Sequence, residues 1–565
     1  MTIDAIIMVV IFFAASILYM DLDVKKWITN VKAHNKSFFI VQGIRLSIPL
    51  LWTFIAWYWI LLDLSIWSIL IWHVVSLTFF YTVVTFLQYS IGEAKFKTIA
   101  TLWILTVIII IALVTVPIIT TTATYEYTND FATKTDELMI ISTNDINIIT
   151  EKTALRDTKT SLAQFPDTSR YTSGSIYKQS VNGEKLWVSP VNYESGLKAW
   201  GDDKFIPGYI TIDVTTTKGF NVVNDLEIKY APSAIWDKSL FRHVHHNYPT
   251  VLLYKEAFEL DDNNNPYWIV PYGHFAYFRS FKVVDGVFIV DPMTGEINQY
   301  TVDNVPEWVN TVYPADIAEN FCKAYGENSL GFFSKIFFAS SQFTLTEWTW
   351  NDKGDDAWSI FFDADGQMWY ASDTTNLKAS ERTMVGYILM SARTGEILYN
   401  DNIKGINGNG ICQNFLQPYI EKPGWVLAEP TLYSIDNIPT WFSTIVDENG
   451  AIQMYCFGTT TGEIATDTSF QKALSLYRGM INSKGNNSIV DNEYLFEITG
   501  NVFRINCIND NTYIILDQNR NLVITVPDAI SVFAKMTIVN DNVNVKYSIF
   551  ENEEAVATEF TNNNL

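Results

Sequence analysis

The sequence has few of the residues from which metal and redox sites are built. Its 565 residues include four cysteines and six histidines, and no two cysteines form a C-x-x-C pair. This spacing argues against a zinc ribbon and against a thioredoxin-like site. The dispersed cysteines leave two states open, namely one or two disulfides in an oxidising compartment or four buried thiols. They are Cys322, Cys412, Cys456 and Cys507.

Positive charge is also scarce, with 38 Lys and Arg against 61 Asp and Glu. Residues 1–120 carry a net charge of +2, so the remaining chain carries −25 of the total of −23. An acidic body repels phosphate backbones, which argues against a nucleic-acid partner. The sequence contains no G-x-S-x-G elbow and no Walker loop. We therefore assign no catalytic residue and no cofactor-binding residue.

Long apolar runs, in contrast, fill the beginning of the chain. A run of about 20 apolar residues is enough to cross a bilayer core of about 30 Å. The first run lacks a basic start and a small-residue cleavage site, so we interpret it as a retained helix and not as a signal peptide. Residues 1–120 are therefore predicted to form a transmembrane domain with four helices. The four runs are Ile3–Met20, Phe38–Leu62, Ile66–Ile91 and Thr98–Thr120.

Loop charges predict how these helices are oriented. The loop 21–37 holds four lysines and the loop 92–97 holds two, whereas the turn 63–65 has no cation. Positively charged loops stay in the cytoplasm. Both termini and the large C-terminal region are therefore expected outside the cytoplasm, with the lipid bilayer as the first partner.

The body after residue 120 is repetitive. A T-G-E-I motif recurs at 294–297, 394–397 and 461–464, and Thr217-Lys218-Gly219 occupies the equivalent place in an earlier unit. The glycine of this motif suits the left-handed position of a turn between two strands. Two further signals accompany it. Aromatic strands carry Trp187, Trp268, Trp358 and Trp441, which we interpret as core residues more than as a glycan platform, and hairpin turns are predicted at 284–286, 363–366 and 447–450.

Helical segments precede several of these strands, so each unit is predicted to be a helix followed by antiparallel strands. This pattern predicts α+β units that bury one helix against one sheet face. The units are residues 121–220, 221–305, 306–400 and 401–484. Residues 485–550 are predicted to form a small all-β barrel that resembles an OB-type fold, and residues 551–565 a flexible tail.

The T-G-E-I turns after an aromatic strand and a helix resemble the PepSY module of secreted and membrane-anchored bacterial proteins. The whole arrangement, over roughly residues 135–470, is similar to uncharacterised multi-span envelope proteins of bacteria and phages. The resemblance implies a PepSY-like repeat array in the cell envelope. It transfers no catalytic residue, and the chain has no adjoining protease on which a PepSY module would act.

Two groups of residues are candidate metal ligands. On a strand, His243 and His245 would share one face and could bind Zn²⁺ with His274; on a helix they would point apart. Asp261 opens a D-x-N-x-N series with calcium-loop spacing, although Pro266 replaces the required glycine. The alternatives are a packed histidine cluster and an ordinary polar loop.

The leading hypothesis is a non-enzymatic, membrane-anchored binding or scaffolding protein that contacts an envelope protein or the cell wall. Repeats without a catalytic signature commonly bind or space other molecules. Two alternatives remain. One is an extracytoplasmic metal-dependent enzyme centred on His243 and His245, and the other is an accessory subunit of a transport or secretion complex.

Overall fold

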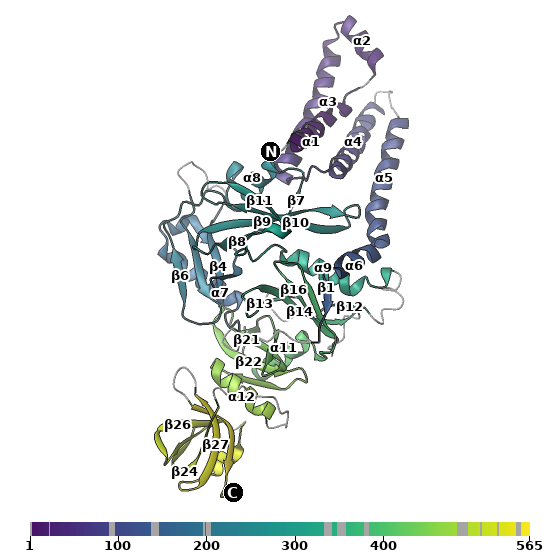
Figure 1. Cartoon of the computed structure of the whole chain (residues 1–565). Coiled ribbons are helices and arrows are strands. Elements are labelled where there is room, and N and C mark those ends of the chain that lie inside the picture. The colour runs from purple at the N-terminus through teal and green to yellow at the C-terminus, as the bar shows by residue number, and fades with distance from the viewer. Residues whose placement is uncertain are drawn as a thin grey trace.

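The computed structural model describes residues 3–21, 23–89, 96–136, 146–195, 198, 205–332, 342–346, 348, 358–377, 383–482, 495–508, 511–527, 530–549 and 555–565. Apolar helices form one end of the molecule, β-sheets form its middle, and a barrel with the C-terminus forms the other end (Figure 1). The N-terminal end of the chain lies beside the sheets, where the helices meet the body.

The helical end contains three helices that are long and apolar enough to cross a membrane, or up to four if a bent pair counts as one span. The three are Lys36–Ile60, Ile66–Val84 and Ala100–Ile119, and the pair Ile3–Tyr19 with Val24–Lys32 bends by 70°. The elements are α1 (Ile3–Ala14), η1 (Ala15–Tyr19), α2 (Val24–Lys32), α3 (Lys36–Ile55), η2 (Ala56–Ile60), α4 (Ile66–Tyr89) and α5 (Phe96–Ile119).

Polar side chains face one another between these helices while many apolar ones point outward, as expected in a lipid environment. His73 in α4 contacts the carbonyl oxygen of Phe12 in α1 at 3.0 Å. Thr78 and Thr106 link α4 to α5 through their hydroxyls, 2.6 Å apart.

Four sheets in the body share one strand order. In each, two short segments pair with one side of a long second strand, and the third strand pairs with its other side. The fourth strand pairs with the third. The first sheet contains β2 (Tyr171–Ser173), β3 (Tyr177–Val181), β4 (Glu184–Tyr193), β5 (Tyr209–Asp213) and β6 (Phe220–Val223). The second contains β7 (Leu252–Leu253), β8 (Ala257–Leu260), β9 (Pro266–Ala276), β10 (Phe281–Val290) and β11 (Ile297–Thr301).

The third sheet contains β12 (Phe343–Leu345), β13 (Ser359–Phe362), β14 (Met368–Asn376), β16 (Gly386–Ser391) and β17 (Ile397–Asn400), and β1 (Ala132–Lys134) forms its edge beside β17. The fourth contains β19 (Val426–Leu427), β20 (Thr431–Ile435), β21 (Ile438–Val446), β22 (Ile452–Thr459) and β23 (Ile464–Asp467). A further pair, β15 (Thr383–Met384) and β18 (Gly405–Ile406), stands apart from these sheets.

A helix precedes each sheet in the chain. In all four units, the segment before that helix is hydrogen-bonded to its own sheet in the same way. Backbone N–H groups of this segment donate to a carbonyl in the turn between the last two strands of the same sheet. The pairs are Ile148 and Ile149 to Val214, Lys229 and Tyr230 to Pro292, Val312 and Tyr313 to Ala392, and Ile406 to Thr460. The helices are α7 (Glu151–Ser161), α8 (Leu240–Asn247), α9 (Ala315–Glu327) and α11 (Gly408–Leu416).

Three of the recurring tryptophans occupy one equivalent strand position in the core. Trp187, Trp268 and Trp441 pair with Ile212, Val290 and Gly458 of the third strand. Each indole N–H donates to a carbonyl of the segment before the helix, at 2.9, 2.9 and 3.2 Å. The core interpretation is therefore confirmed for these three, and Trp358 is buried in the core as well.

The prediction that Trp358 is the equivalent residue of the third unit is wrong. The register of β14 against β16 aligns Tyr370 with Met390, and this is the pair that corresponds to Trp268 and Val290. Trp358 lies just before β13. The predicted turn at 284–286 is also wrong, because these residues lie inside β10, where the register shifts between Val284 and Gly286 as in a β-bulge.

The C-terminal strands form a closed five-stranded barrel in the order β24-β25-β26-β28-β27. The strands are β24 (Leu495–Ile508), β25 (Asn511–Leu516), β26 (Asn519–Pro527), β27 (Asn542–Ile549) and β28 (Ala555–Asn562). The prediction of a flexible tail over 551–565 is therefore wrong for its described part. Ala555, Ala557 and Phe560 are buried, and β28 closes the barrel between β26 and β27.

No disulfide joins the four cysteines. Cys322, Cys412 and Cys456 are buried thiols, whereas Cys507 is exposed.

Candidate functional site at the junction of the apolar helices and the second sheet

The helix α8 packs against the ends of the apolar helices, and its sequence explains why. The buried residues of α8 are Leu240, Arg242, Val244 and His245. A helical period of 3.6 residues places positions 240 and 244 on one face. Leu240 and Val244 therefore form one packed face of the helix, and side chains from its other faces contact the apolar helices.

The histidines of α8 do not converge. The His243 ring lies 4.4 Å from that of Tyr230, and its Nε2 is 2.7 Å from the carbonyl oxygen of Gly295, within its own unit. His245 Nε2 contacts the carbonyl oxygen of Leu62, just beyond the π-turn η2, at 2.9 Å. The ring of His246 stacks on Trp57 with centroids 4.5 Å apart.

Burial determines the protonation state of the central histidine. His245 is 1% exposed, and this burial lowers its pKa to about 4. Burial lowers the pKa of His246 as well. The neutral His245 ring donates its Nε2 hydrogen to Leu62, so α8 is tied to the apolar helices by an uncharged hydrogen bond.

Arg242 forms a second tie between α8 and η2, which follows α3. Its guanidinium donates to the carbonyls of Tyr58 at 3.0 Å and Trp236 at 2.7 Å. It also lies over the rings of Tyr58 and Trp59, 4.6 and 4.9 Å from their centroids. Cation–π contacts of this kind suit an arginine at an aromatic-rich boundary.

The tip of the β9–β10 hairpin provides a third contact. Tyr277, Phe278 and Arg279 all have positive φ, between 49° and 67°. Non-glycine residues rarely adopt this conformation and persist in it only where the surroundings fix it. Here Phe278 packs edge-on against Trp67, and Ser280 contacts Thr120 at the end of α5 through their hydroxyls, 3.1 Å apart.

Arg279 at this tip pairs with a buried carboxylate. Asp63, between α3 and α4, is 7% exposed and lies 3.3 Å from Arg279 Nη1. It also accepts hydrogen bonds from Ser65 at 2.8 Å and Ser68 at 2.6 Å. A buried carboxylate with this many partners is strongly held in one geometry.

The last apolar helix joins the third sheet directly. After α5 the chain continues as α6 (Thr121–Asn129) and then as β1 (Ala132–Lys134), which pairs in parallel with β17. Tyr125 stacks on Tyr325 of α9 with centroids 6.0 Å apart. The body is thus attached to the apolar helices through both its second and its third sheet (Figure 1).

The predicted metal ligands remain dispersed. Among the described residues, no group of three or more His, Cys, Asp and Glu side chains is arranged to hold a metal ion. His274 pairs with Asp285 at 2.8 Å on the surface of the second sheet. Asp261 caps the β8–β9 turn by accepting from the backbone of Asn263 and Asn265. The described residues provide no set of ligands for zinc or calcium, so both metal sites remain predictions.

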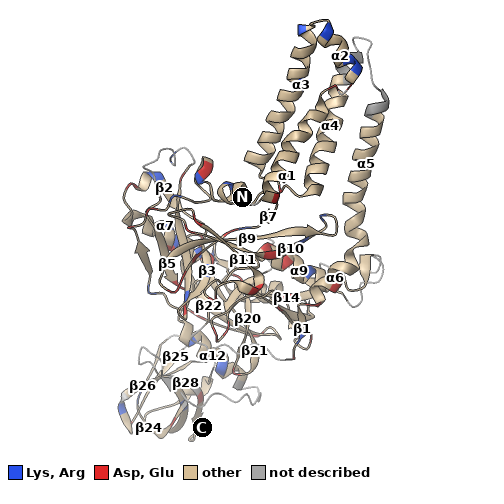
Figure 2. Cartoon of the chain, turned by 45° about the horizontal axis from the view of Figure 1, so that its top comes forward, with Lys and Arg blue, Asp and Glu red and all other residues tan. Residues whose placement is uncertain are grey.

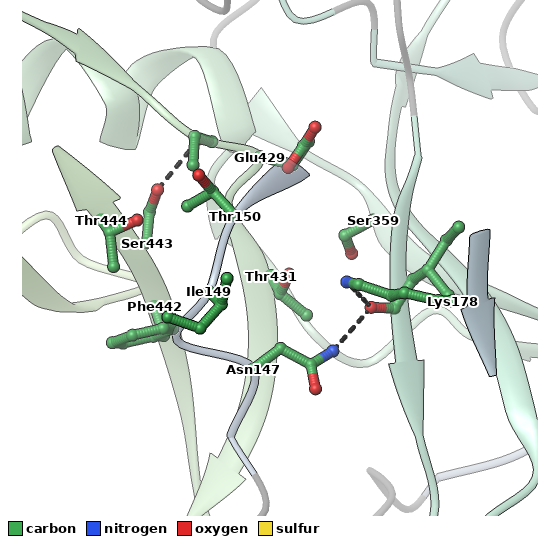
Figure 3. Close-up of a pocket in the computed structure, with 12 residues that line it drawn as sticks. Asn147, Ile149, Thr150, Lys178, Ser359, Glu429, Thr431, Phe442, Ser443 and Thr444 are labelled. Atoms are coloured by element: carbon green, nitrogen blue, oxygen red, sulfur yellow. Dashed lines mark hydrogen bonds between the residues drawn. The ribbon is translucent and has the colours of Figure 1, made fainter. Parts of the chain in front are cut away.

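A small polar cavity lies between the first, third and fourth sheets (Figure 3). Its volume is about 30 Å³, which suits one or two water molecules. The Lys178 ammonium donates to the carbonyl oxygen of Ile360 at 2.8 Å, and Asn147 donates to the same oxygen (Figure 3). Burial lowers the pKa of Lys178 to about 8. This partly buried lysine was not singled out by sequence, and its surroundings come from three units.

Two buried carboxylates join successive units. Glu259 on β8 accepts from the backbone N–H groups of Asn310 and Thr311, which precede α9, at 2.7 and 2.9 Å. Asp373 on β14 accepts from Gly408 at the start of α11 at 3.0 Å. Burial raises the pKa of both carboxyl groups. Each acid of one sheet thus binds the helix segment of the next unit.

No family model matches the chain, and no curated protein matches it.

Proposed function

We propose that the protein is a membrane-anchored, extracytoplasmic scaffold of the cell envelope that holds its C-terminal barrel at a distance from the membrane and binds a protein partner there. Three features support this proposal. The apolar helices occupy one end of the molecule, the sheets are tied to them and to one another, and the barrel lies at the opposite end (Figure 1).

The observation that carries the binding role is an apolar patch on the barrel. The segment 532–539, between β26 and β27, contains five apolar side chains that are each between 49 and 66% exposed. They are Val532, Phe533, Met536, Ile538 and Val539. Exposed apolar patches on folded domains commonly mark interaction sites. We call these five residues the barrel patch.

The chemistry of the barrel patch favours a protein over a glycan. Its side chains are mainly aliphatic, and glycan hydroxyls require hydrogen-bonding groups beside an aromatic platform. Aliphatic and aromatic side chains at the centre of a patch are typical of protein interfaces. The occupant we propose is therefore an envelope protein with an apolar surface of its own.

The proposal also includes the type of barrel, the type of repeat and the side of the membrane on which the body lies. The barrel order, with the third and fifth strands in parallel, supports an OB-type barrel. The repeated helix-and-sheet unit with its T-G-E-I turn supports a PepSY-like array. The helix α2 (Val24–Lys32) and its lysines lie at the end of the molecule away from the body (Figure 2), which supports an extracytoplasmic body.

Cross-linking in cells with the full chain tests the proposal. The double substitution Phe533→Glu with Ile538→Glu should lower recovery of the cross-linked partner about tenfold or more, because two central apolar contacts are lost. Phe503→Glu is the control, since Phe503 is an exposed apolar residue of β24 outside the barrel patch. Equal recovery of the cross-linked partner with the parent chain, the double variant and the control would contradict the proposal. A cross-linked dimer of the chain itself that depends on the barrel patch would also contradict it.

A further inference from the structure

The short helix α2 has two faces of different chemistry. Val24, Trp27, Ile28 and Val31 follow the i, i+3, i+4, i+7 pattern of one helical face. Lys25, Lys26 and Lys32 lie outside that stripe. Few residues of α2 are packed against the protein: Val24, Ile28 and Val31 are 68, 50 and 53% exposed, and the three lysines are exposed as well.

The position of α2 places this stripe at the end of the apolar helices. The helix lies at the end away from the body, and its lysines form the blue group at that tip (Figure 2). It is bent by 70° from the helix pair α1–η1, so it does not continue that span. A membrane around α3, α4 and α5 would therefore end close to α2.

The local contacts fix this bend. Asp23 caps α2 by accepting from the backbone of Lys25 and Lys26. The Trp27 indole donates to the carbonyl oxygen of Asp21, and its ring packs edge-on against Phe38 at 5.2 Å. Trp27 thus anchors α2 to the start of α3, while Val24, Ile28 and Val31 remain uncovered by the described residues.

We propose that α2 lies in the plane of the membrane surface opposite the body, with Val24, Ile28 and Val31 among the acyl chains and Lys25 and Lys32 on anionic phospholipid headgroups. The inference rests on the membrane placement in the proposed function. Amphipathic helices with basic flanks bind anionic surfaces in this way. Lys25 and Lys32 lie seven residues apart and hence on the same side of the helix, where their stems can reach along the apolar stripe to the headgroups. Near an anionic surface, each basic residue contributes about 1 kcal/mol of attraction.

Site-specific fluorescence in liposomes tests the inference. The full chain carries Cys507→Ser, which removes its exposed thiol, and a single cysteine at position 28 or 29 labelled with a small fluorophore. The liposomes contain phosphatidylcholine with or without phosphatidylglycerol. A nitroxide lipid should quench position 28 about twofold or more better than position 29, and aqueous iodide should show the opposite preference, because adjacent helix positions point in different directions.

The outcomes are distinguishable. Loss of the preference after Lys25→Gln with Lys32→Gln, or without phosphatidylglycerol, would support recognition of anionic headgroups. An unchanged preference in every lipid would contradict that part of the inference. Equal quenching at positions 28 and 29 would contradict the inference as a whole, and protection of position 28 from both quenchers would show a protein contact instead. Strong lipid quenching at position 40, on the exposed face of α3, shows that the spans are inserted and separates these failures from failure of the membrane placement.

Discussion

At the scale of single residues, the glycines of the T-G-E-I turns show what the repeat requires. Gly295, Gly395 and Gly462 have φ of +79°, +76° and +98°, so the predicted left-handed conformation is confirmed. A Cβ at Gly295 would lie 2.4 Å from the Tyr230 ring, and one at Gly395 would lie 2.7 Å from Tyr313. Both tyrosines belong to the segment that is tied to the same turn.

Gly→Ala substitutions separate the two causes of strain. Gly219, in the equivalent turn of the first unit, has φ of +101° and no atom near its Cβ position. Gly219→Ala should destabilise by about 1 kcal/mol from the backbone alone, whereas Gly295→Ala and Gly395→Ala should destabilise by about 2–4 kcal/mol. Thermal unfolding of the full chain in detergent measures the difference. Equal losses at all three positions would mean that the tyrosine contact is unimportant.

The buried His245 predicts a dependence of stability on pH. Its pKa falls from an ordinary value near 6.5 to about 4 on folding, so the unfolded chain binds more protons between these values. The contribution of neutral His245 is fully present above pH 6.5 and is lost as pH falls toward 4. The difference corresponds to about 3 kcal/mol.

His245→Gln keeps a side-chain donor for the Leu62 carbonyl but does not titrate. The variant should therefore lose less stability than the parent chain between pH 6.5 and 4. Parallel melting curves of parent and variant over this range measure the effect, and the comparison removes the contributions of other groups such as Glu259. Identical pH profiles for the two chains would contradict the assignment.

At the scale of elements, the β9–β10 hairpin tip ties the body to the apolar helices through a buried ion pair. Asp63→Asn and Arg279→Gln, alone and together, should give a coupling free energy of about 1–3 kcal/mol, because the carboxylate is buried. The exposed pair Lys546–Glu559 on the barrel is the control and should couple by less than about 1 kcal/mol. Denaturation in mild detergent provides the four free energies. Additive effects at 63 and 279 would show that the pair does not hold the junction.

The sequence predicted the elements whose signal is local, and it failed where strands had to be paired. Apolar runs and T-G-E-I turns are local patterns, and both have counterparts in the structure. Tyr370 was missed because its equivalence to Trp268 exists only in the strand register. The bulge at Gly286 resembled a turn because Asp-Gly is a preferred pair in tight hairpin turns. The polar composition of 551–565 as a whole hid β28, whose partners are β26 and β27.

At the scale of the whole molecule, the candidate junction could not have been predicted from local sequence. Its contacts join residues that are far apart in the chain, such as Leu62 with His245 and Asp63 with Arg279. The histidines were noticed for their chemistry as metal ligands, but in the structure they pack α8 against the apolar helices. The molecule is therefore best understood as three linked parts, with the tied sheets between the apolar helices and the barrel.

The central claim is that the barrel and the tip of α2 lie on opposite sides of a membrane, and thiol labelling tests it most directly. Cys507 is an exposed cysteine on the barrel, and the other three are buried. A membrane-impermeant maleimide should label Cys507 in intact cells. In a chain with Cys507→Ser and Lys32→Cys, it should label position 32 only after the membrane is permeabilised. Labelling of position 32 in intact cells, with Cys507 protected until permeabilisation, would contradict the account.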